Sequence, residues 1–138
     1  MRAPCIRFAL LACIAALPAF AQDLRPESLK LYGGVYSPDC GNEAAPRVRI
    51  GADALEIAGG ARSLRTRPTA DSYTSFGGAP TSPVPAGYQV EFIGDDFSLY
   101  VFQDAQGLHV PLHDYVPAAA PIVGPQAMKL RFGRCPAR

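Results

Sequence analysis

Hydrophobic and polar residues alternate with a period of two along most of the chain after residue 21. Segments 47–50 and 54–57 place aliphatic residues between charged or small ones, and segment 88–92 repeats the pattern. Successive side chains of a strand point to opposite faces, so this alternation predicts strands with one buried and one solvent-facing side. Segment 97–102 is apolar at nearly every position, which is typical of a central strand.

Short turn sequences separate these segments. Gly59-Gly60 predicts a tight hairpin between 54–58 and 61–67, and Gly94-Asp95-Asp96 predicts the turn into 97–102. Asp104 to Gly107 predicts a four-residue turn in which glycine takes a left-handed conformation. The remaining predicted strands are 29–36, 72–76, 108–112 and 128–132.

Eight or nine short strands joined by tight turns describe an antiparallel meander. We predict an all-β fold, a small barrel of about eight strands, since that number is filled by its own side chains. A two-sheet β-sandwich is the alternative, because it has the same strand pattern. Helix is expected at most as one turn at 26–28.

The first 21 residues have the pattern of a secretory leader. Arg2 and Arg7 precede an apolar run at 8–17, and Ala19-Phe20-Ala21 is an A-x-A cleavage signature. The run is about half the length of a membrane span. We predict a signal peptide at 1–21, cleaved after Ala21, and a single all-β domain at 22–138 in the periplasm or outside the cell. A lipoprotein box ending at Cys13 is the disfavoured alternative, because the later cleavage site would then be redundant.

Cleavage changes the cysteine and charge counts. It removes Cys5 and Cys13, so Cys40 and Cys135 remain and predict one disulfide that ties the start of the domain to its end. It also removes two of the 13 basic residues and leaves the 12 acidic ones. A nearly balanced charge gives no footprint for nucleic acid, and no segment predicts a membrane span in the mature chain.

Two proline-rich segments, 77–87 and 116–126, interrupt the short turns. Long connections inside a compact domain are often binding loops, and prolines reduce the entropy lost on binding. Aromatic residues flank the first segment, and exposed tyrosine beside small polar residues is typical of protein recognition. We therefore predict partner-binding residues there; the alternative is a stiff connection whose aromatics plug the barrel end. The predicted residues are Tyr73, Ser75, Phe76, Pro80, Pro83 and Tyr88.

Basic residues occur in pairs with strand spacing, at Arg47 and Arg49, Arg65 and Arg67, and Lys129 and Arg131. Each pair alternates with apolar positions, so it belongs to the outer face of a strand. If the first hairpins pair, Arg49 and Arg65 lie in one basic patch that could steer an acidic partner. The alternative is an ordinary solvated face, where charge also discourages edge-to-edge pairing.

Catalytic chemistry has little support in the sequence. His109 and His113 are about 13 Å apart if they lie on one strand, too far to share a metal ion. Pro111 argues against a helix there and suggests an edge strand or a bulge. No serine lies in a G-x-S-x-G elbow, and the acids fall mostly in turns. We predict no catalytic residue, no metal site and no cofactor.

No motif matches a known family residue for residue. The expected architecture resembles, at the level of fold alone, that of small secreted inhibitors of bacterial cell-wall hydrolases. We therefore predict a non-enzymatic binding protein, an inhibitor or immunity-type protein that occludes such a hydrolase with its proline-rich loop. The alternatives are a carrier that holds a small apolar ligand in its barrel, as lipocalins do, and a structural envelope protein. A carrier needs a cavity, so an interior packed by 55, 57, 90, 92, 99 and 101 would exclude it.

Overall fold

A computed structural model describes residues 24–73 and 88–138 of the chain. Within these residues, nine strands form one antiparallel sheet in the order β4-β3-β2-β1-β9-β8-β7-β6-β5. The predicted signal peptide lies outside the described residues. In chain order the elements are α1 (Pro26–Tyr32), β1 (Gly34–Ser37), β2 (Arg47–Ile50), β3 (Leu55–Gly59), β4 (Arg62–Thr66), β5 (Pro68–Tyr73), β6 (Tyr88–Gly94), β7 (Ser98–Asp104), β8 (Gly107–Val110), the 3-10 turn η1 (Pro117–Ala119), α2 (Ala120–Val123), the 3-10 turn η2 (Ala127–Lys129) and β9 (Phe132–Arg134).

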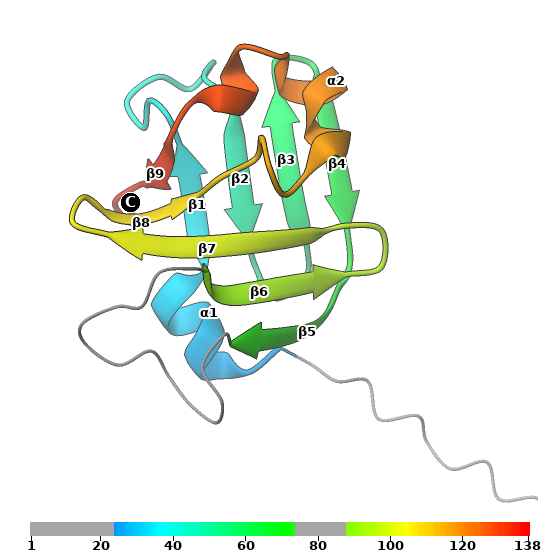
Figure 1. Cartoon of the computed structure of the whole chain (residues 1–138), viewed down its shortest axis with the longest axis vertical. Coiled ribbons are helices and arrows are strands. Elements are labelled where there is room, and N and C mark those ends of the chain that lie inside the picture. Colours follow the sequence, from blue (N-terminus) through cyan, green and yellow to red (C-terminus); the bar gives the residue numbers. More distant parts are fainter. Residues whose placement is uncertain (1–23, 74–87) are drawn as a thin grey trace, which may run out of the picture.

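The sheet is folded over on itself into a nearly closed barrel. Strands β1 to β4 form one side, and β5 to β8 cross in front of them (Figure 1). Only Arg67 separates β4 from β5, so the chain passes directly from one edge of the sheet to the other. The predicted all-β meander barrel is confirmed.

Hydrogen bonds across the corner at Thr66 and Arg67 hold the two edges together. Thr66 Oγ1 lies 3.1 Å from Asp96 Oδ2 and accepts from Asp96 N at 3.0 Å, and Arg67 O accepts from Asp95 N at 3.1 Å. The β6–β7 turn thus fixes the corner between β4 and β5. These contacts join the end of β4 to the opposite side of the nearly closed barrel.

The barrel interior is filled with side chains from both sides of the sheet. Tyr36 lies fully buried in the core and donates to Tyr32 O at 2.5 Å, which links β1 to the end of α1. The six residues on which the carrier hypothesis depended are all fully buried: Leu55, Ile57, Val90, Phe92, Leu99 and Val101.

The predicted disulfide and hairpins are also confirmed. Cys40 and Cys135 are bonded, with their Cα atoms 5.5 Å apart. Gly60 and Gly107 have positive φ angles of 59° and 107° in the turns after β3 and β7, where glycine avoids the clash of a Cβ atom.

Two predicted strands are wrong in part. Residues 26–32 form helix α1, so the strand predicted over 29–36 is reduced to β1. Leu24, Ser28 and Tyr32 are buried at a spacing of four, which is one face of a helix, and Pro26 occupies its first turn.

The strand predicted over 128–132 is a 3-10 turn followed by β9, with Met128 and Phe132 buried four residues apart. The second proline-rich segment, predicted as a long loop, contains η1 and α2. Strand β8 ends before Pro111 and pairs with both β7 and β9, so the predicted edge position is wrong.

Candidate functional site

The predicted proline-rich loop joins β5 to β6. Residues 74–87 lie outside the described part of the chain, and with them Ser75, Phe76, Pro80 and Pro83. The strands place the two ends of this segment: β5 ends at Tyr73, and the first residue of β6, Tyr88, pairs with Phe102 of β7. The chain therefore leaves the sheet from its edge strand β5 and re-enters it in β6, next to β7.

Tyr73 contacts helix α1. Its hydroxyl lies 2.8 Å from Ser28 Oγ, and the Arg25 guanidinium lies 4.3 Å from the centre of its ring. Tyr32 packs edge-on against the same ring at 6.2 Å between ring centres. Tyr73 thus connects the helix to the strand that precedes the predicted loop.

Next to Tyr73, Asp71 is the carboxylate that anchors α1. Its side chain is 2% exposed, and it accepts from Arg25 N at 3.0 Å, Arg25 Nε at 2.7 Å and Ser28 Oγ at 2.5 Å. Burial opposes ionisation of Asp71, but the hydrogen bonds from Arg25 and Ser28 outweigh it and lower its pKa. The group is therefore charged and fully engaged in holding the helix.

Arg49 and Arg65 lie on one outer row of the sheet, with Glu56 between them. Arg49 pairs with Glu56 across β2 and β3, and Glu56 pairs with Arg65 across β3 and β4. The structure brings the two predicted residues into one row, but the row alternates in charge.

The third predicted basic pair does not share a strand face. Lys129 belongs to η2, and Arg131 precedes β9. Arg131 donates through Nη1 and Nη2 to Asp104 at 2.7 and 2.8 Å, a two-point ion pair. The pairing of Lys129 with Arg131 on one strand is therefore wrong, because Lys129 belongs to a 3-10 turn and β9 begins only at Phe132.

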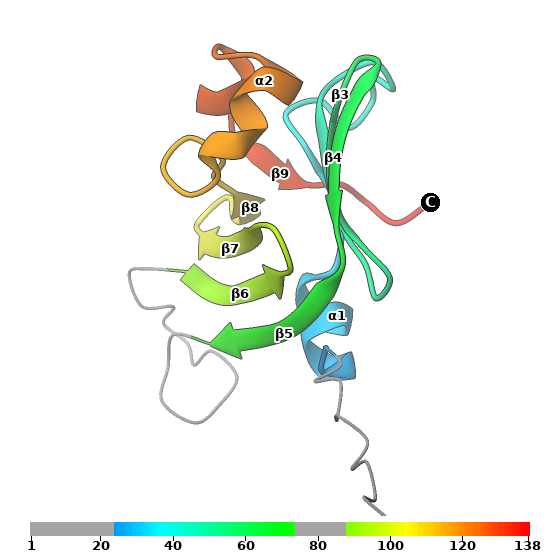
Figure 2. The same cartoon turned by 90° about the vertical axis from the view of Figure 1, so that its right-hand side faces the viewer.

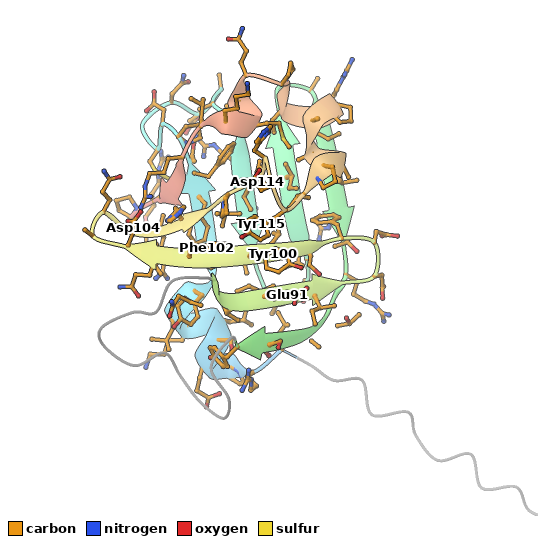
Figure 3. The ribbon with its side chains drawn as sticks, in the orientation of Figure 1. Glu91, Tyr100, Phe102, Asp104, Asp114 and Tyr115 are labelled. Atoms are coloured by element: carbon orange, nitrogen blue, oxygen red, sulfur yellow. A yellow bond between two sulfur atoms is a disulfide. The ribbon has the colours of Figure 1, made fainter. Side chains whose placement is uncertain are left out.

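An aromatic surface covers the outer face of β7 and β8. It consists of Tyr100, Phe102 and Tyr115 (Figure 3), together with His109 of β8. The Tyr115 ring lies 5.0 Å from that of Tyr100 and 5.2 Å from that of Phe102, and Phe102 lies 5.8 Å from His109 between ring centres. These distances are those of direct ring contacts.

Side chains along β7 point alternately into and out of the barrel, and this alternation produces the surface. Leu99 and Val101 point into the core, so Tyr100 and Phe102 point outward. The sequence contained a signal for this surface, because segment 97–102 is apolar on both faces. The central position inferred from it is confirmed, since β7 pairs with both β6 and β8, but the second apolar face belongs to the outside of the barrel.

Tyr115 reaches this surface from a turn held by its neighbours. Leu112 and Val116 are buried, and Val116 N donates to Leu112 O at 2.9 Å. Between them His113, Asp114 and Tyr115 are exposed, with Tyr115 at 41%. The core thus anchors the turn and presents its tyrosine.

Carboxylates flank the aromatic surface. Tyr100 Oη donates to Glu91 Oε1 at 2.9 Å, and Asp114 adjoins Tyr115 in the turn (Figure 3). At the far end of β7, the two-point contact with Arg131 lowers the pKa of Asp104. His109 Nδ1 lies 3.8 Å from Asp104 Oδ2, but burial together with Arg131 lowers the pKa of His109 and favours its neutral form.

This arrangement is suited to recognition. Aromatic faces beside carboxylates bind cationic or partly apolar groups, because the ring faces and the carboxylates both attract positive charge. Among the described residues, no group of three or more His, Cys, Asp and Glu side chains could hold a metal ion. No helix in the described ranges is long and apolar enough to cross a membrane.

Comparisons with protein-family models, with curated proteins and with solved structures found no match to this chain.

Proposed function

We propose that the chain is an exported, non-enzymatic binding protein that occludes another protein. Its partner would be an enzyme of the cell-wall hydrolase kind, and the protein would act as its inhibitor or immunity protein. The observation that carries the proposal is the aromatic surface. Tyrosine and other aromatic residues concentrate at the centres of protein interfaces, where they bury much area at a low cost in entropy.

The carboxylates beside the rings define the partner's chemistry. Glu91 is hydrogen-bonded to Tyr100, and Asp114 is exposed next to Tyr115. A lysine or arginine of the partner could meet a ring face and a carboxylate together, which is a favourable geometry for a cation. A partner with a basic surface fits this site best.

The strand that follows the proline-rich segment pairs with the strand that carries the rings. Tyr88, the first described residue after segment 77–87, pairs in the sheet with Phe102. This connection along the chain supports a joint role for the proline-rich segment and the sheet face.

The interior favours surface binding over a carrier function. The core residues from both sides of the barrel are fully buried against one another. An apolar ligand would need to displace close-packed side chains, which costs several kcal/mol for each large residue moved. The disulfide Cys40–Cys135 supports an exported location, where such bonds persist.

Inhibition assays test the proposal. Purified muramidases, amidases and endopeptidases from the host's cell wall are assayed with the mature protein and with a Tyr100→Ala/Tyr115→Ala variant. Leu130→Ala is the control, since Leu130 is 50% exposed and lies outside the aromatic surface. We expect inhibition of one enzyme class, at least tenfold weaker for the double variant and unchanged for the control. Equal inhibition by all three proteins, or no inhibition of any class, would contradict the proposal.

A further inference from the structure

A second surface lies on the other side of the barrel. An open groove of about 980 Å³ runs over the outer face of β1 and β2, next to β9 and the tail at 135–138. Figure 2 shows the C-terminal tail beyond β1–β4, on the side away from β6–β8. We name this feature the basic groove after four of its lining residues, Arg47, Arg49, Arg134 and Arg138.

The four guanidinium groups retain much of their binding capacity. Arg134 donates Nη1 to Leu31 O at 2.7 Å, and Arg47 donates Nη2 to Asn42 O at 2.9 Å. These acceptors are neutral carbonyls, so both positive charges stay uncompensated. Arg47 Nε is buried and meets no acceptor among the described residues.

The other two arginines, Arg49 and Arg138, are both exposed. Arg138 is paired with Glu43 at 3.2 Å, but both side chains are more than 70% exposed, so water weakens the pair. Arg49 makes no ion pair with any residue in the described ranges, and Glu56 is its neighbour on the adjoining strand. None of the residues lining the groove is acidic. The groove therefore carries concentrated positive charge.

The wall of the groove is held in place at Cys40 and Cys135. The disulfide Cys40–Cys135 belongs to its lining, and Cys135 N donates to Val35 O at 2.8 Å. These bonds hold the tail that carries Arg138 against the strand next to Arg49. A fixed site loses little entropy when a ligand binds.

We propose that the basic groove binds an anionic ligand with two or more phosphate or carboxylate groups. The planar guanidinium fork matches both groups through paired hydrogen bonds. The groove offers four guanidinium groups, from β2, β9 and the tail. These are more than one phosphate or carboxylate group can bind. The site is independent of the aromatic surface.

Titration calorimetry at low ionic strength tests the proposal, with pyrophosphate and citrate as probes and chloride as the reference anion. We expect saturable one-site binding of at least one probe that weakens as salt is added. Pyrophosphate and citrate separate phosphate from carboxylate recognition by their relative affinities. Absence of saturable binding of both probes would overturn the proposal.

Variants locate the binding. Arg49→Ala should weaken probe affinity at least tenfold and Arg49→Lys less, because lysine keeps the charge but loses the fork. Arg65→Ala is the matched control, an outer-face arginine of the same sheet that does not line the groove, and it should bind as the parent does. An equal loss of probe affinity in Arg49→Ala and Arg65→Ala would refute the assigned site.

The Tyr100→Ala/Tyr115→Ala variant should keep full probe affinity, so this test can fail independently of the proposed inhibition.

Discussion

Asp71 illustrates how a single residue ties two elements together. Its carboxylate accepts from the backbone and the side chain of Arg25 and from Ser28, and it is almost completely shielded from water. Arg25 also covers the ring of Tyr73. The start of α1 and the end of β5 are therefore held by one charged group.

Replacing Asp71 by asparagine should lower the free energy of unfolding by about 1–3 kcal/mol, because charge-assisted hydrogen bonds are lost at a shielded site. Urea unfolding at pH 7 measures the change. Asp95→Asn is the control: Asp95 pairs with Arg67 at 3.1 Å, but both side chains are exposed. Water screens a pair on the surface, so the control should change stability little.

The Asp71 contribution should depend on pH. The folded protein lowers the pKa of Asp71, so the unfolded chain takes up this proton first as the pH falls. The stabilisation is complete above the ordinary carboxyl pKa and is lost as the pH falls below about 4. The stability difference between parent and Asp71→Asn should shrink over that range; a constant difference would mean that the charge of Asp71 does not stabilise the fold.

At the level of single residues, the alternation of apolar and polar positions predicted which side chains are buried. It did not predict which side chains meet on the outer face. Val90, Phe92, Leu99 and Val101 are buried as expected. The contacts of Tyr100 and Phe102 with Tyr115 depend on a turn that begins after β8, which no local pattern reveals. The same is true of the bond between Asp71 and Arg25, residues 46 positions apart.

At the scale of elements, the misassigned strands have a common cause. In 29–36 and 128–132, apolar residues occur at alternate positions, and a period of two was inferred from them. Burial instead follows a spacing of four, at Ser28 and Tyr32 and at Met128 and Phe132. Short apolar runs fit both periods, so only tertiary contacts decide between strand and helix.

The packing of α2 on the β3–β4 hairpin depends on Gly59. A Cβ atom there would lie 2.5 Å from Ile122 O and 2.9 Å from Val123 Cα. Gly59→Ala should push α2 away and lower the free energy of unfolding by about 1–3 kcal/mol, measured by urea unfolding. Gly133→Ala is the control, since a Cβ atom at Gly133 meets nothing within 4 Å. If both variants had the parent's stability, the close approach of α2 would be disproved.

At the scale of the whole molecule, the strand count and the two remaining cysteines favoured the barrel over the sandwich. The disulfide places the start and the end of the domain side by side, which is where β1 pairs with β9. The corner at Arg67 was not predicted, because the strand after 61–67 was expected only at 72–76, whereas β5 begins at Pro68. Barrel and sandwich thus remained alternatives until the order of the strands was known.

The disulfide closes a loop of 95 residues and should contribute strongly to stability. Replacing Cys40 and Cys135 by alanine should lower the free energy of unfolding by about 2–5 kcal/mol, mainly because the unfolded chain gains freedom. Reductant should shift the unfolding midpoint of the mature parent in the same direction and leave the variant unchanged. Equal midpoints for oxidised and reduced parent would contradict this contribution.

If a protein partner binds at the aromatic surface, site-specific crosslinking in the host should capture that partner there. A photoreactive phenylalanine is placed at Tyr115 and, as controls, at Leu31 and Leu130, which are exposed to a similar degree outside that surface. We predict that position 115 forms an adduct with one specific protein, that neither control does so, and that Tyr100→Ala abolishes the adduct. No adduct at position 115, or the same adducts at all three positions, would contradict the account.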